Sequence, residues 1–150
     1  SAFSMLFFYT SNLSKKKYNL GTKKVNIQKA NSILSSAQLS WDKSKIYIQQ
    51  ARVNSKLGNL ALANTYYQKG LSYNPYDVSL LHKYSRFLFD NGNYSEAYHY
   101  SKKAYELCNR YLANEVLLIE CLDKLGKTPK AIKRAKFLKE LLNKTTCNSF

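Results

Sequence analysis

Three glycines recur at an interval of 34 residues, at Gly58, Gly92 and Gly126. Each is followed five residues later by an alanine, so the alanines keep the same interval. A fixed period of this length is typical of proteins built from stacked helical repeats, whose single units are too small to bury an apolar face alone. Because glycines and alanines share the register, a helical bundle with glycines at chance positions is a poor alternative.

The stretch from Leu57 to Asp77 shows how one such unit is built. Gly58 and Asn59 end one helix and begin another, and Asn74-Pro75 ends the second, because the residue before proline is disfavoured in the α region. Between these breaks, apolar or small residues recur with the three-to-four spacing of a helix face, at Leu60, Ala63, Tyr67 and Leu71.

Extending this pattern along the chain predicts six helices, at about Ser44–Leu57, Leu60–Tyr73, Val78–Asn91, Tyr94–Leu107, Leu112–Leu125 and Thr128–Asn143. Asp77 is a good N-cap for the third helix, and Thr128-Pro129 supplies an N-cap and a proline in the first helical position of the last. We expect the small side chains of Ala63, Ala97 and Ala131 to let the two helices of each unit approach closely.

These units resemble the tetratricopeptide repeat (TPR), a helix–turn–helix unit of the same length. The first unit fills the glycine, small, aromatic, small and proline positions of the family's second helix with Gly58, Ala63, Tyr67, Gly70 and Pro75. The match weakens in the later units and in the first helices. The resemblance spans Ser44 to about Asn143 and implies an all-α fold, an α-solenoid of stacked antiparallel helical hairpins with about three repeats plus a degenerate N-terminal helix.

The predicted organisation has three parts: an apolar stub and basic linker (residues 1–24), the repeat domain (25–143, with repeats at about 44–77, 78–111 and 112–143) and a C-terminal tail (144–150). The run from Ala2 to Tyr9 is too short to span a bilayer. Because Lys15–Lys17 follow this run, a secretory signal is disfavoured. The order fits the cytoplasmic end of a transmembrane helix, or a stub that packs on the first repeat.

The net charge of +15 is concentrated at the two ends of the chain. Residues 1–40 and residues 127–150 each contribute +6, whereas the repeat body between them contributes only +3. Basic ends can meet nucleic acid, anionic lipid or an acidic protein; solubility and a lysine-rich composition are the alternative explanations.

No catalytic constellation is present in the sequence. His82 and His99 show no metal-ligand spacing, and there is neither a glycine-rich phosphate loop nor a GxSxG serine. Three cysteines, Cys108, Cys121 and Cys147, lack CxxC spacing. We therefore expect a protein that is not an enzyme and that needs no cofactor or metal.

In the TPR family, the first helix of each repeat lines a concave groove that binds a peptide. Matching by register gives a candidate ligand groove formed by Lys45, Ile48, Gln49, Arg52, Lys56, His82, Lys83, Arg86 and Phe89, continued in the third repeat by Ala113, Val116, Glu120 and Asp123. The cations of the first two repeats would suit an acidic segment or a chain terminus, unless they are merely solvated. The positions of the chaperone-binding carboxylate clamp hold Ile48 and Arg52, so that activity is not predicted.

The sequence thus favours a protein–protein interaction module that binds an acidic peptide segment in a basic concave groove. One alternative is a cytoplasmic or periplasmic TPR-like tail of an integral membrane protein, such as an envelope-polysaccharide polymerase or ligase, with membrane contact through the N-terminus. Nucleic-acid binding through the basic ends ranks last, because the interleaved aromatics and glycines of RNA-binding motifs are missing. A cytoplasmic or membrane-associated location is favoured, but the sequence does not fix the compartment.

Overall fold

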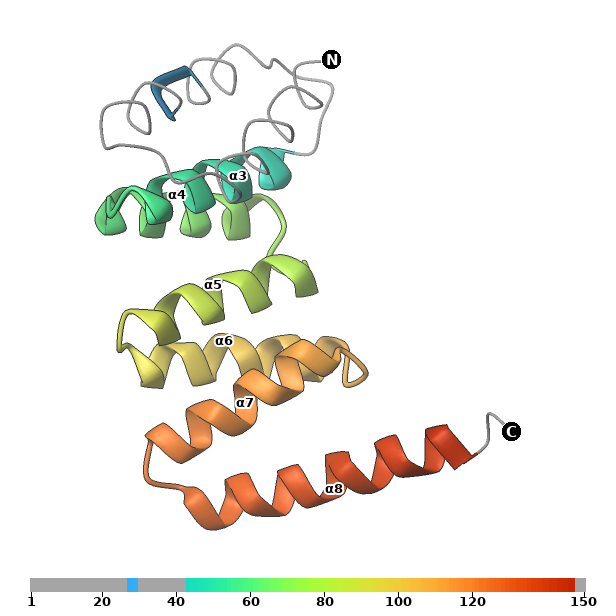
Figure 1. Ribbon diagram of the computed structural model, residues 1–150. Helices are drawn as coiled ribbons and strands as arrows, with labels where there is room; N and C mark the ends of the chain where they lie inside the picture. The colour runs from blue at the N-terminus through green and yellow to red at the C-terminus, as the bar shows by residue number, and fades with distance from the viewer. Residues whose placement is uncertain (1–26, 30–42, 148–150) are drawn as a thin grey trace. The chain divides into compact units, whose positions relative to one another are not determined.

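The computed structural model describes residues 27–29 and 43–147, and every regular element in these ranges is a helix (Figure 1). The chain divides into two compact units, residues 1–75 and residues 76–150. The predicted stub and linker, the predicted N-terminal helix apart from residues 27–29, and the last three residues of the tail lie outside the described residues. Residues 27–29 are helical, and Ile27 is buried.

The described part of the first unit includes a helical hairpin, formed by α3 (Lys43–Lys56) and α4 (Leu60–Tyr73). The observed α4 has the predicted bounds, and α3 begins and ends one residue earlier than predicted. The two helices bury facing sets of small and apolar residues: Ile48, Ala51, Val53, Ala63 and Tyr67. Polar side chains of α3 are buried as well, among them Ser44 and Asn54.

The second unit contains two hairpins, α5 (Val78–Asp90) with α6 (Tyr94–Leu107) and α7 (Leu112–Lys124) with α8 (Thr128–Cys147). The hairpins are joined by packing of α6 against α7, and the first helices α5 and α7 also contact each other (Figure 1). The core is built mainly from side chains that are almost fully buried: Leu80, Leu81, Tyr84, Leu117, Leu118 and Cys121. The prediction of helical hairpins at a 34-residue interval is therefore confirmed.

Glycine ends the first helix of each hairpin in the left-handed region, with φ of +81° at Gly58, +81° at Gly92 and +74° at Gly126. At Gly92 the turn is closed by two backbone bonds: Gly92 N–H donates to Phe89 O (3.0 Å) and Asn93 N–H donates to Leu88 O (2.9 Å). The same pair of bonds recurs at the other two glycines. Since only glycine enters this region without a steric cost, the repeated glycine dictates the repeated turn.

The ends of the helices confirm one capping prediction and correct another. Asp77 caps α5, because its side chain accepts a hydrogen bond from Leu80 N–H (3.1 Å). The prediction for Thr128-Pro129 was wrong by one residue: α8 already includes Thr128, whose Oγ1 donates to Asp123 Oδ1 (3.0 Å). The prediction that the last helix stops at Asn143 was also wrong, since α8 continues to Cys147.

Small residues occupy the positions where paired helices come closest. Ala63 and Ala97 are fully buried, and Ala131 is nearly so. In the α5–α6 hairpin the close approach lets the Ser85 hydroxyl donate to the Ala97 carbonyl oxygen across 2.6 Å. A larger side chain at Ala97 would have to displace α5, because protein interiors are packed without spare volume.

Within the described residues, no helix is both long enough and apolar enough to cross a membrane.

Candidate functional site

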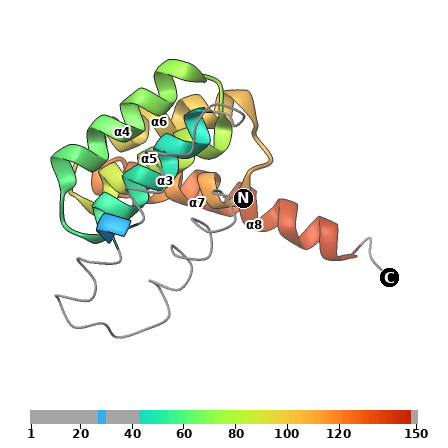
Figure 2. The same cartoon turned by 90° about the horizontal axis from the view of Figure 1, so that it is seen from above.

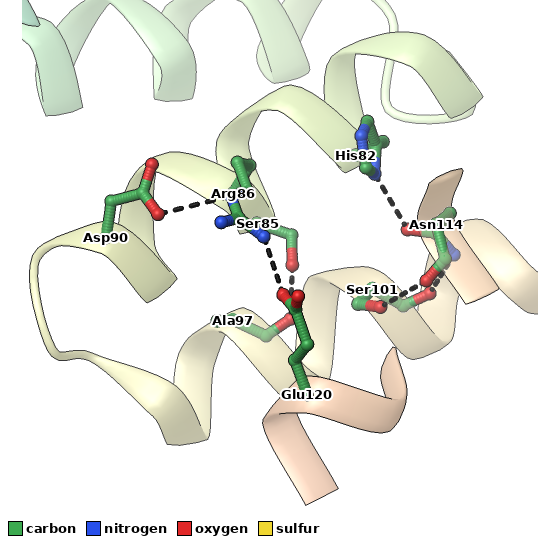
Figure 3. A network of polar contacts seen from close by, with 8 residues as sticks. All are labelled: His82, Ser85, Arg86, Asp90, Ala97, Ser101, Asn114 and Glu120. Atoms are coloured by element: carbon green, nitrogen blue, oxygen red, sulfur yellow. Dashed lines mark hydrogen bonds and ion pairs between the residues drawn. The ribbon is translucent and has the colours of Figure 1, made fainter. Parts of the chain in front are cut away.

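Equivalent positions of neighbouring repeats meet on one surface of the second unit. Arg86 in α5 and Glu120 in α7 are 34 residues apart, and Arg86 Nη1 lies 2.6 Å from Glu120 Oε2 (Figure 3). Because equivalent helices of consecutive repeats stack on each other, α5 and α7 present equivalent side chains side by side. We call the surface formed by His82, Arg86, Phe89 and Glu120 the α5–α7 face; Asn114 is buried beneath it.

Arg86 is the central cation of the α5–α7 face. Its Nε also pairs with Asp90 Oδ1 at 3.1 Å, and its guanidinium lies 5.2 Å from the centroid of the Phe89 ring. The side chains of Arg86 and Glu120 remain 46% and 40% exposed. Arg86 therefore stands at the surface between two carboxylates of its own chain, and a ligand carboxylate must share it with them.

His82 lies in a second polar network of the same face (Figure 3). Asn114 Nδ2 donates to Ser101 O (2.8 Å), which leaves Asn114 Oδ1 facing His82 Nδ1 at 3.4 Å. Because an amide oxygen can only accept, His82 is the donor in this contact, through Nδ1. The Tyr111 ring packs edge-to-face against the His82 ring, and the two ring centroids are 4.9 Å apart. Burial lowers the pKa of His82; the Asn114 hydrogen bond opposes this, and the charges of Arg86 and Lys83 add to it.

The other residues predicted for the second unit lie near this face. Lys83 and Phe89 are half-buried on α5, while Ala113, Val116 and Asp123 are exposed on α7. The structure thus brings together the α5 part of the predicted groove and its third-repeat continuation. The pairing of the central cation with Glu120 was not foreseen.

The first unit places its predicted groove residues unevenly along α3. Lys45 and Lys56 are exposed, and Arg52 is half-buried with Nη1 donating to Gln49 Oε1 (3.3 Å). Ile48 is only 4% exposed and Gln49 only 9%. In α3 the surface available to a ligand therefore comes from the three cations, whereas Ile48 and Gln49 chiefly belong to the packing of the helix.

Sequence reasoning missed an ion pair in the last hairpin, between Arg134 of α8 and Glu115 of α7. Arg134 Nε donates to Glu115 Oε1 (2.9 Å) and Arg134 Nη2 to Oε2 (3.1 Å), while the guanidinium lies 4.4 Å from the Tyr105 ring centroid. The Glu115 side chain is only 9% exposed. A signal did exist: the equivalent positions one repeat earlier hold Leu81 and Tyr100, whereas in the third repeat both positions hold residues of opposite charge.

The remaining reactive groups do not form a site in the part of the chain that the structure describes. Burial raises the pKa of the Cys121 thiol to about 12, with Glu120 adding to the effect and Arg86 opposing it. This thiol stays protonated at neutral pH and is a poor nucleophile. No three His, Cys, Asp or Glu side chains gather there as metal ligands.

Comparison with known proteins places the chain by its fold. No protein-family model matches it, and no curated protein matches it by sequence.

Among solved structures, the chain is similar to "Crystal structure of MamA", with a TM-score of 0.68 and 14% identity over 97% of this chain and 90% of that one. It is also similar to "MamA RS-1 ArsTM double mutant", with a TM-score of 0.65 and 14% identity over 87% of this chain and 71% of that one. MamA is a TPR-like helical-repeat protein. At this identity the likeness shows the fold alone: the chain is all-α, of the helical-repeat solenoid class.

Proposed function

We propose that this chain is a non-catalytic interaction scaffold that binds an acidic segment of a partner protein through the first helices of its repeats. The TPR-like fold supports a binding role at the level of architecture. The observation that carries the proposal is the meeting of Arg86 and Glu120, which shows that side chains of two repeats form one exposed surface. A segment lying across α5 and α7 can be held by both repeats at once.

The cations of α3 and of α5 favour an acidic ligand, whereas α7 carries three acidic residues and one lysine. The sequence of α3 contains three lysines and one arginine and no acidic residue, and α5 adds Lys83 and Arg86. Two carboxylates use only part of the guanidinium of Arg86, which has five N–H donors. A ligand carboxylate can engage the others, and charge-assisted hydrogen bonds contribute about 1.5–3 kcal/mol each when partly desolvated.

A binding measurement with a labelled Glu-rich peptide, carrying a free C-terminal carboxylate, tests the proposal. The double variant Arg52→Glu with Arg86→Glu should weaken binding at least about tenfold. Circular dichroism should show an unchanged helix signal, because Arg86 is exposed and Arg52 is half-buried.

The matched control is Lys133→Glu with Lys136→Glu on α8, which changes the net charge equally and leaves α3 and α5 intact. It should retain most of the binding. If instead the α8 pair abolishes binding and the α3–α5 pair does not, the basic terminal helix is the contact surface and the proposal is wrong.

A further inference from the structure

The second unit contains a groove that the α5–α7 face does not use. It has a volume of about 750 Å³ and lies between the C-terminal half of α8 and the corner where α6 ends and α7 begins. We call it the α8 groove; its walls include Tyr105, Leu112, Phe137, Leu138 and Leu141, with the exposed cation Arg110 beside them. This volume falls within the range of specific ligand sites, and most of the walls are apolar, as in such sites.

Differences between equivalent residues explain why the groove opens. In the second repeat, the fully buried Ala104 lets α6 lie close to α5, whereas the equivalent residue of α8 is Leu138. In the third repeat, the Arg134–Glu115 pair occupies the positions that Tyr100 and Leu81 hold in the second repeat. As a result, α8 contacts α7 less extensively than α6 contacts α5. Figures 1 and 2 both show the C-terminal half of α8 projecting beyond the start of α7.

The walls of the groove expose large apolar side chains. Phe137 is 59% exposed, Leu112 47% and Leu141 45%. Phe137 and Leu141 are one helical turn apart, so they form a stripe along α8 that faces the corner across the groove. A rimmed apolar surface of this kind marks a site of association.

Charge decides which occupant fits. Five lysines of α8, at positions 130, 133, 136, 139 and 144, are offset by Glu140 alone, since Arg134 is already paired with Glu115. A second copy of the chain would place its own lysine-rich α8 close to these lysines, and like charges placed together disfavour association. Residues 1–40 of the chain also carry lysines and no acid, so they are disfavoured for the same reason. The complementary occupant combines apolar anchors with acidic residues.

We infer that the α8 groove binds an acidic amphipathic helix of a partner protein. The apolar side of that helix packs on Phe137, Leu141 and Leu112, and its acidic residues face Arg110 and the lysines of α8. A helix suits the site because anchors spaced by three to four residues match the stripe on α8. The inference goes beyond the proposed function, because it concerns a different surface, built mainly on α8.

The test uses a fluorescein-labelled helical peptide with leucines at every third or fourth position and glutamates elsewhere. Fluorescence anisotropy should show saturable binding to the wild-type chain. Phe137→Glu should weaken this binding at least about tenfold, as expected for a central anchor. The matched control is Ile132→Glu on the same helix, because Ile132 is 49% exposed but lies outside the groove; it should change the affinity by less than about twofold.

Several outcomes would overturn the inference. Equal effects of the two α8 variants would remove the groove as the contact surface, and equal binding of a peptide with lysine in place of glutamate would remove charge complementarity. Self-association in sedimentation velocity that disappears in Phe137→Glu would make a second copy the occupant. Binding to phosphatidylglycerol vesicles that depends on Phe137 would make it a lipid surface.

The two proposals fail separately. Arg86→Glu leaves α8 unchanged and should bind the helical peptide as the wild type does. If Arg86→Glu abolishes that binding while Phe137→Glu does not, the peptide occupies the α5–α7 face; the groove inference is then wrong and the proposed function stands.

Discussion

Arg86 Nη1 and Glu120 Oε2 lie 2.6 Å apart across two helices, in equivalent positions of consecutive repeats. Both side chains remain substantially exposed, and an exposed ion pair contributes only about 0–1 kcal/mol to stability. The pair is therefore better suited to organising a surface than to holding the fold together. It places one carboxylate beside the cation that an acidic ligand would use.

Glu120→Gln tests that competition. Removing the carboxylate should strengthen binding of the Glu-rich peptide several-fold and change the free energy of unfolding by less than about 1 kcal/mol. Titration calorimetry and thermal melts measure the two effects. Asp123→Asn, an exposed position on the same helix, removes the same charge away from Arg86. An equal gain in both variants would show that net charge alone, and not Arg86, determines the affinity.

Arg134→Met should be strongly destabilising, because it leaves the 9% exposed Glu115 carboxylate without its bidentate partner. We expect a loss of about 2–3 kcal/mol, below the range for a fully buried pair because Arg134 is partly exposed. Urea unfolding measures it. The double change Glu115→Leu with Arg134→Tyr installs the residues of the preceding repeat and should recover most of the loss. A double variant as unstable as Arg134→Met would contradict this account.

Ala97→Leu should destabilise the chain by about 1–3 kcal/mol, because the added atoms overpack the contact where Ser85 reaches the Ala97 carbonyl. The comparison is Ala135→Leu on α8, where the alanine is exposed and the expected change is within about 0.5 kcal/mol. Thermal melts of both variants measure the difference. An unchanged melting temperature for Ala97→Leu would mean that α5 and α6 can move apart at this contact without a loss of stability.

Gly92→Ala should cost about 1–2 kcal/mol, because alanine at a φ of +81° brings its Cβ close to its own backbone. No other atom lies within 4 Å of the added Cβ, so the cost comes from the backbone alone. Gly92→Asn should cost less, since asparagine tolerates the left-handed region better. Chemical unfolding of the two variants gives the ranking, and the reverse order would point to a steric contact instead.

Acid should selectively weaken the His82 network. The pKa of folded His82 lies below the ordinary value of 6.5, so the unfolded chain binds its proton more readily. The contribution of neutral His82 to the free energy of unfolding is fully present above about pH 6.5, the pKa in the unfolded chain. It is lost as the pH falls from there through the pKa of the folded state. His82→Gln should flatten this part of the stability–pH profile. Identical profiles for the wild type and His82→Gln would contradict the burial argument.

The helices and turns of the repeats could be predicted because their causes are local. Gly58, Gly92 and Gly126 end helices through their own backbone conformation, and Asp77 caps α5 through a neighbouring N–H group. The predicted end of α8 was wrong because no local signal marks it. No glycine or proline follows Asn143, so nothing local stops the helix there.

The predicted site depended on register, and register identifies a helix face only approximately. It correctly put Arg86 and Glu120 on one surface, because one repeat period separates them. It could not show that Ile48 and Gln49 are buried, since a first helix packs on two sides and a shift of one residue turns a side chain by about 100°.

The sequence by itself determined the period, the helical hairpins and the basic character of α3 and of α8, because these follow from backbone preference, side-chain volume and composition. Only the tertiary structure decided that Arg86 pairs with Glu120, that Arg134 pairs with the buried Glu115, and that Leu138 lines the α8 groove. Each of these depends on side chains from different helices meeting in space. Their separations of 34 and 19 residues fall outside the range over which a single helix imposes contacts.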